Sequence, residues 1–151
     1  MRDTDLIPEI ADWNDGRGIS VESWVSCVGN FELAIGFLRL FWPTFEERDG
    51  CLLRAGYSEQ CYQEFLKHTN GDRTAIEAVL NHVHITDLFC DPKLNPTEDQ
   101  VVHIGRLLKK MWTAKLAHEF PSLNVSVDFR ETEIECLVDY QVTVVINRKV
   151  A

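Results

Sequence analysis

The sequence has no apolar run long enough to cross a membrane and no recognisable leader. Its longest nearly apolar stretch is residues 31–42, which is interrupted by Glu32 and Arg39, whereas a bilayer span takes roughly 20 residues. The acidic start Met1–Asp5 is followed by no apolar segment, so it is unlike a secretory signal. We therefore expect a cytoplasmic protein that is not embedded in a membrane.

The cysteines show no spacing typical of a metal or redox site. An odd number of them in a chain without a leader favours free thiols in a reducing compartment over a disulfide framework. Their mostly apolar surroundings predict that most are buried. The five are Cys27, Cys51, Cys61, Cys90 and Cys136.

The motifs of common catalytic and cofactor sites are also missing. The chain contains no phosphate-binding G-x-x-x-x-G-K-[ST] loop and no G-x-S-x-G turn. A calcium loop starting at Asp12 would need Gly and Glu where the chain has Arg17 and Ser23. The sequence therefore predicts no cofactor and names no reaction.

The chain is acidic, with a formal net charge of −9, and the charge is uneven. Residues 1–100 carry −10, whereas residues 101–151 carry +1. Nucleic-acid binding depends on Lys and Arg, which release counterions from phosphates, so we expect no nucleic-acid partner. The acidity suits a basic protein partner, and its other interpretation is that it only keeps the protein soluble.

At 151 residues, 45% of them hydrophobic and 26% charged, the chain has the size and composition of one globular domain. No repeat or linker divides it, so we expect a single domain over residues 1–151. The patterns predict an α+β fold in which about five helices pack on a small antiparallel sheet. That sheet includes a C-terminal β-hairpin.

Capping residues and apolar periodicity predict the helices. They are expected to begin near Ser20, Phe31, Ser58, Arg73 and Asn95, and to end near Val28, Trp42, Asn70, Ile85 and Pro121. The helix over residues 31–42 is apolar on all sides, which predicts that it lies in the middle of the core. In the last helix Asn95 is the expected N-cap, and Gly105 predicts close packing of another part of the chain.

Two segments near the C-terminus alternate apolar and polar residues, as half-buried strands do. They cover residues 123–130 and 136–147 and should pair antiparallel. Their expected core-facing residues are Leu123, Val125, Val127, Phe129, Tyr140, Val142, Val144 and Ile146. A second hairpin, over residues 44–54, is expected around Asp49-Gly50 because that pair suits a type I′ turn.

The densest group of ligand-type residues is His82, His84, Asp87 and Cys90. On the helix expected here, His82 and His84 diverge by about 200°, so the sequence predicts no metal site. The alternative is a small hydrolytic or metal-dependent enzyme with its site near His82, His84 and Asp87.

Two acidic groups are the candidate partner-binding residues. They are Glu46, Glu47 and Asp49 at one hairpin, and Glu131, Glu133 and Glu135 at the other. Carboxylates on short hairpins either protect a sheet edge or form a docking patch for a basic protein. The basic residues of the long helix, Arg106, Lys109, Lys110 and Lys115, are expected to form a solvated face.

The first hypothesis is therefore a non-catalytic module that binds a basic protein partner. Small acidic cytoplasmic proteins that neutralise a toxin are similar in size, charge and lack of catalytic motifs. No matched residues support that likeness, so no family is assigned. The enzyme is the second hypothesis, and a homo-oligomeric structural protein using the apolar hairpin edge is the third. The oligomeric state is left open.

Overall fold

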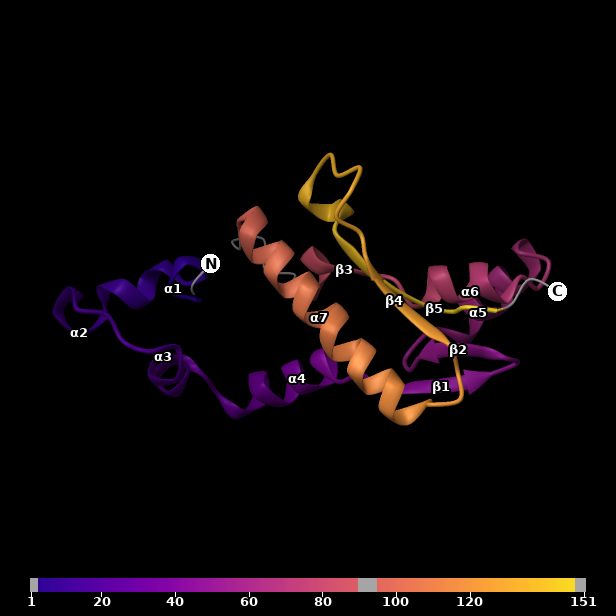
Figure 1. Cartoon of the computed structure of the whole chain (residues 1–151), viewed down its shortest axis with the longest axis horizontal. Helices are drawn as coiled ribbons and strands as arrows, with labels where there is room; N and C mark the ends of the chain where they lie inside the picture. The colour runs from indigo at the N-terminus through magenta and orange to yellow at the C-terminus, as the bar shows by residue number, and fades with distance from the viewer. Residues whose placement is uncertain (1–2, 90–94, 149–151) are drawn as a thin grey trace. The chain divides into compact units, whose positions relative to one another are not determined.

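The computed structural model describes residues 3–89 and 95–148. The chain divides into two compact units, residues 1–38 and residues 39–151. The described residues form seven α-helices and two small antiparallel sheets (Figure 1). The expected α+β class is confirmed, with more helices than the five predicted. A single domain over residues 1–151 stays a prediction.

The first unit consists of short helices. They are α1 (Asp3–Leu6), the 3₁₀ helix η1 (Pro8–Asp12), α2 (Trp13–Gly16), α3 (Val21–Val28) and the first part of α4 (Phe31–Phe41). The Ser20 hydroxyl accepts a hydrogen bond from the Ser23 amide at 3.2 Å, and Asn30 Oδ1 accepts one from the Leu33 amide at 2.8 Å. These two caps begin α3 and α4 where the sequence predicts.

The prediction that residues 31–42 form the centre of the core is wrong. They do form a helix, but none of the residues of α4 is buried. Phe31 is 87% exposed, and Ile35 and Leu38 are more than half exposed. Hydrophobicity on every side of a helix predicts burial only if other elements surround it, and the core of the second unit assembles instead around α7 and the C-terminal strands.

The second unit starts with the hairpin that the Asp-Gly pair predicts. Strands β1 (Phe45–Arg48) and β2 (Cys51–Arg54) pair antiparallel. Both turn residues have positive φ, 50° at Asp49 and 78° at Gly50, as a type I′ turn requires. Leu52 and Leu53 are fully buried, so β2 carries the buried side of this hairpin.

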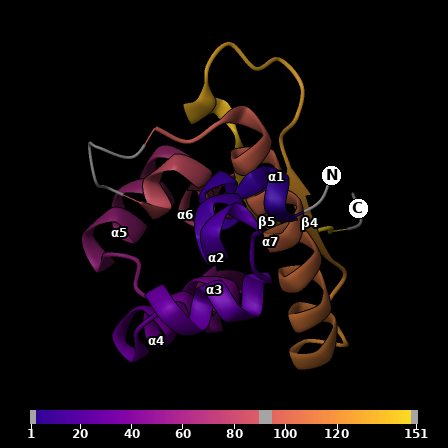
Figure 2. The ribbon, with the colours of Figure 1, turned by 90° about the vertical axis from the view of Figure 1, so that its left-hand side faces the viewer.

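Helices α5 (Glu59–His68) and α6 (Arg73–Leu80) follow the hairpin and lie side by side (Figures 1 and 2). Helix α6 is shorter than the predicted 73–85. After it come the short strand β3 (Val83–His84) and the 3₁₀ helix η2 (Ile85–Leu88). Pairing of Val83 and His84 with β5 overrides the apolar periodicity that favoured a longer helix.

The three-stranded sheet has the order β3-β5-β4. Strands β4 (Val125–Phe129) and β5 (Gln141–Ile146) pair antiparallel, with Val127 opposite Val144. The predicted pairing is confirmed, although β5 begins later than residue 136 because Leu137–Asp139 form the 3₁₀ helix η3. Each residue predicted to face the core is buried or partly buried.

Helix α7 (Glu98–Glu119) lies along β4 and β5 in both views (Figures 1 and 2). Its N-cap is Thr97 rather than the predicted Asn95, and Thr97 forms a capping box with Gln100. The close approach predicted at Gly105 is confirmed. A Cβ there would lie 2.8 Å from Phe129 Cδ2 and closer still to the outer atoms of that ring.

Two buried polar side chains of α6 join β2 to β5. Glu77 accepts hydrogen bonds from the Leu52 amide (2.8 Å) and the Ile146 amide (2.9 Å). Asn81 donates to the carbonyls of Leu52 and Val144 and accepts from the Arg54 amide. These contacts satisfy backbone groups that would otherwise be buried without a partner, and they fix the end of β2 near β3.

Two further expectations need correction. Cys51 is buried, but Cys27, Cys61 and Cys136 are exposed, and all four are free; Cys90 lies outside the described residues. Lys115 is not part of a solvated face, since it is only 3% exposed. Its ammonium contacts Glu119 and lies 5.0 Å from the centre of the Trp42 ring. Among the described residues, no helix has the length and apolar character to span a membrane.

Candidate functional site

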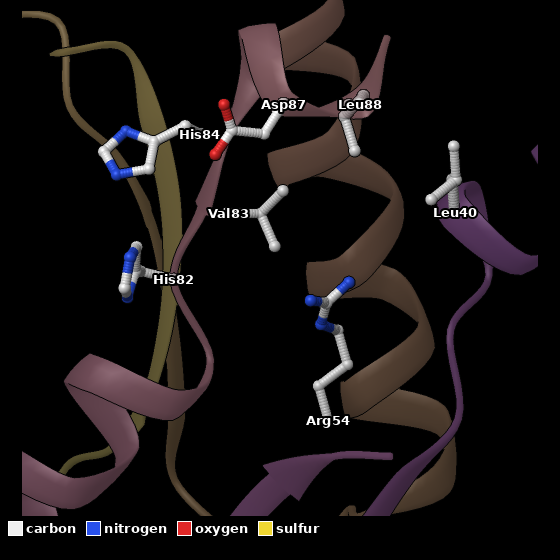
Figure 3. A pocket seen from close by; sticks show the side chains of 7 residues that line it. All are labelled: Leu40, Arg54, His82, Val83, His84, Asp87 and Leu88. Atoms are coloured by element: carbon white, nitrogen blue, oxygen red, sulfur yellow. The ribbon is translucent and has the colours of Figure 1, made fainter. Parts of the chain in front are cut away.

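A pocket of about 270 Å³ lies beside β3 in the second unit (Figure 3). Its position follows from α6, which ends at Leu80 and lets the next residues run as a strand along β5. The lining residues are Leu40, Arg54, His82, Val83, His84, Asp87 and Leu88. Three of the four residues in the predicted ligand-type group therefore line one pocket, and the fourth, Cys90, lies outside the described residues.

His82 and His84 project from the same side of β3, whereas Val83 and the Arg54 guanidinium lie on the other side (Figure 3). The two imidazole rings are nearly perpendicular, with centroids 5.1 Å apart. The predicted divergence of these histidines is wrong, because alternate residues of a strand share a face whereas residues two apart on a helix do not. The geometric argument against a shared ligand is thereby removed.

Backbone carbonyls orient both imidazole rings. His82 Nδ1 lies 2.5 Å from the Val79 carbonyl oxygen, and His84 Nδ1 lies 2.5 Å from the Val138 carbonyl oxygen. A carbonyl oxygen can only accept, so each Nδ1 is the donor. In the neutral form of each ring, the lone pair is then on Nε2. Each histidine therefore presents Nε2 to whatever approaches this side of β3.

Two imidazoles alone do not make a tight metal site. Structural zinc sites use four protein ligands, and catalytic zinc sites use three. Within residues 3–89 and 95–148, no three His, Cys, Asp or Glu side chains are grouped in a way that could hold a metal ion. Asp87 belongs to η2, immediately after β3.

Arg54 gives the other side of the pocket its charge. Burial lowers the pKa of its guanidinium from the usual value, because desolvation disfavours the charged form. In the part of the chain that the structure describes, no carboxylate forms an ion pair with this side chain. A guanidinium beside Val83 and Leu88 is suited to a carboxylate attached to an apolar group.

The six predicted partner-binding carboxylates do not form one surface. The β1–β2 hairpin and the connection between β4 and β5 lie at opposite ends of the second unit (Figure 1). At the hairpin, Glu46 and Glu47 are exposed, whereas Asp49 accepts a 2.8 Å hydrogen bond from the Tyr62 hydroxyl. The hairpin carboxylates therefore differ in how free they are to meet a partner.

The same division holds at the β4–β5 connection. Glu131 forms an ion pair with Arg106 on α7. Glu133 is highly exposed, with Arg130 at 3.9 Å, and Glu135 is exposed. A docking patch on this connection would therefore depend mainly on Glu133 and Glu135.

Sequence reasoning missed Arg54 as a pocket residue. It is the last residue of β2, and only the tertiary contacts of Asn81 with Leu52 and the Arg54 amide bring it near β3. No local spacing in the sequence carries that information. Comparison with family models, with curated proteins and with solved structures found no match to this chain.

Proposed function

We propose that this chain is a non-catalytic protein-binding module whose β1–β2 hairpin engages a basic protein partner. The observation that supports this is the state of Glu46 and Glu47. Both are exposed on β1, and among the described residues neither forms an ion pair or a side-chain hydrogen bond. A carboxylate held by no intramolecular cation keeps its full charge for a partner.

The rest of the molecule favours electrostatic attraction of such a partner. The net charge is −9, and attraction of opposite potentials raises the rate of encounter more than it strengthens the final complex. The Debye length is about 10 Å at 0.1 M salt, so exposed carboxylates act mainly during approach. The proposed location is the cytoplasm, on the argument from free cysteines, four of which the structure describes.

The test compares charge reversal at the two ends of the second unit. The wild-type chain is used to capture and identify a partner, and association rates are then measured across a range of salt concentrations. E46K/E47K should slow association by about tenfold at low salt, with a smaller effect at high salt. Surface substitutions of this kind usually change stability within about 0.5 kcal/mol, so the fold should persist.

The matched control is E133K/E135K, which makes the same change in net charge at the β4–β5 connection. The hairpin proposal requires E46K/E47K to slow association more than this control does. Equal slowing by both variants would show that only net charge matters. An identified partner that is acidic, or a salt-independent association rate, would refute the proposal.

The enzyme hypothesis is a second candidate because His82 and His84 share one side of β3 and both present Nε2. Its test is the metal content of the purified protein and any hydrolytic activity that depends on these histidines. Loss of such an activity in His84→Ala would support an enzyme.

A further inference from the structure

Helix α4 exposes a regular apolar stripe. Phe31, Ile35 and Leu38 are 87%, 64% and 66% exposed, and Trp42, just after the helix, is 46% exposed. Intervals of four, three and four residues follow the heptad repeat, which aligns side chains along one side of a helix. The opposite side is occupied by half-buried residues, namely Phe37, Leu40 and Phe41. The stripe is therefore the uncovered side of α4.

The first unit has little other means of burying apolar surface. Its described residues, 3–38, include two buried apolar side chains, Leu6 and Ile10. Chains shorter than about 40 residues usually need a metal, a disulfide or oligomerisation to be stable. Cys27, the cysteine of this unit, is free and exposed. Covering the α4 stripe would supply the apolar burial that this unit otherwise lacks.

The charges beside the stripe indicate what covers it. Glu32 and Arg39 are seven residues apart, so they lie on nearly the same side of α4, next to the stripe. If a second copy of α4 lies antiparallel to the first, Glu32 of each copy comes opposite Arg39 of the other. The twofold symmetry produces this pair twice. In a parallel arrangement, Glu32 would instead meet Glu32.

The apolar side chains fit the same antiparallel alignment. When Ile35 lies opposite the partner's Leu38, Phe31 lies opposite the partner's Trp42, so both layers match at once. We propose that α4 is a self-association surface, with a second copy of this chain as its occupant in antiparallel orientation. An isologous contact of this kind is the commonest form of homodimer interface.

A lipid surface is a poorer match for the stripe. Helices that lie on membranes are usually rich in Lys and Arg on their polar side, whereas α4 carries Arg39 as its one basic residue. The net charge of −9 would also repel anionic lipids. The nearly balanced charges of α4 likewise give no attraction for a strongly basic partner.

The test is sedimentation of the full chain across a concentration series, with charge-reversal variants. Each of E32R and R39E replaces two attractive contacts by two repulsive ones and should weaken the dimer about tenfold. The double variant E32R/R39E should restore wild-type association, because both pairs form again with exchanged sign. An equimolar mixture of the two single variants should form heterodimers.

The matched controls E47R and K110E make the same charge changes at exposed residues outside α4 and should leave association unchanged. Leu38→Asp should reduce association more than either single reversal, and circular dichroism should show helix content retained. A wild-type chain that stays monomeric would overturn the proposal. So would single reversals that associate as well as wild type, which a parallel arrangement predicts. Monomers that sediment with phosphatidylcholine vesicles would assign the stripe to lipid instead.

Discussion

Glu77 and Arg148 form an ion pair in which the carboxylate is completely buried and the guanidinium is partly exposed. Arg148 Nη2 lies 2.7 Å from Glu77 Oε1, and the Glu77 side chain has 0% exposure. The same carboxylate accepts hydrogen bonds from the Leu52 and Ile146 amides. One side chain of α6 thus holds together β2, β5 and the residues after β5.

We predict that Glu77→Ala destabilises the second unit by about 3–5 kcal/mol. The substitution leaves a guanidinium and two backbone amides without their acceptor, and loss of one partner from a buried pair costs this much. Urea unfolding measures the change. Asp15→Ala is the control, because its ion pair with Arg17 is exposed on both sides and should contribute less than about 1 kcal/mol. Equal effects of the two substitutions would contradict this account of Glu77.

The contact between Gly105 and Phe129 predicts opposite outcomes for alanine at two helical glycines. Gly105→Ala should destabilise by about 1–3 kcal/mol, because its Cβ would overlap the Phe129 ring. Gly36→Ala should stabilise α4 by up to about 1 kcal/mol, because a Cβ there meets nothing within 4 Å. Thermal unfolding, with helix content from circular dichroism, distinguishes the two.

A smaller residue at position 129 tests the cause. Phe129→Leu should be less harmful in the Gly105→Ala background than in wild type, because it removes the atoms that overlap. Additive effects of the two substitutions would show that the ring does not cause the loss.

Gly105 illustrates what the sequence could predict. A glycine within a long amphipathic pattern indicated close packing, and the period-two alternation indicated the β4–β5 pair; both are local signals. The end of α6 could not be read locally, because the pairing of Val83 and His84 with β5 depends on residues about 60 positions away. The prediction for α4 failed for a related reason. Periodicity shows which residues are apolar, but it does not show which element covers them.

The candidate site shows the same division. The spacing of His82, His84 and Asp87 indicated residues that lie together, and they line one pocket. The orientation of the histidines was predicted incorrectly because it depended on the wrong secondary structure. Arg54 was missed because Asn81, rather than any nearby sequence, places it.

Tyr62 predicts a loss of stability at high pH. Burial, together with the hydrogen bond to Asp49, raises its pKa from 10.0 to about 12. Between these values the folded protein holds a proton that the unfolded chain releases, so stability falls as the pH rises from 10 towards 12. Ultraviolet titration of tyrosinate should show one late component, which Tyr62→Phe abolishes. Asp49→Asn should move this component to lower pH, and an unmoved component would exclude the contribution of Asp49.

The histidine pair on β3 gives the last prediction, which is that the purified protein carries no tightly bound transition metal. Both Nε2 atoms are available in the neutral rings, so the pair supplies two ligands. A third protein ligand is needed for a catalytic zinc site and a fourth for a structural one. The residues described on either side of the 90–94 gap offer no such group of three.

Elemental analysis after purification without added metal checks this prediction directly. Less than about 0.1 zinc per chain is expected, with the same value in His84→Ala. His118→Ala is a control for nonspecific binding, since His118 is an exposed histidine on α7. A content near one zinc per chain that is lost in His84→Ala but kept in His118→Ala would refute the prediction. It would also move the enzyme hypothesis ahead of the binding module, because an additional ligand would then have to complete the site around His82 and His84.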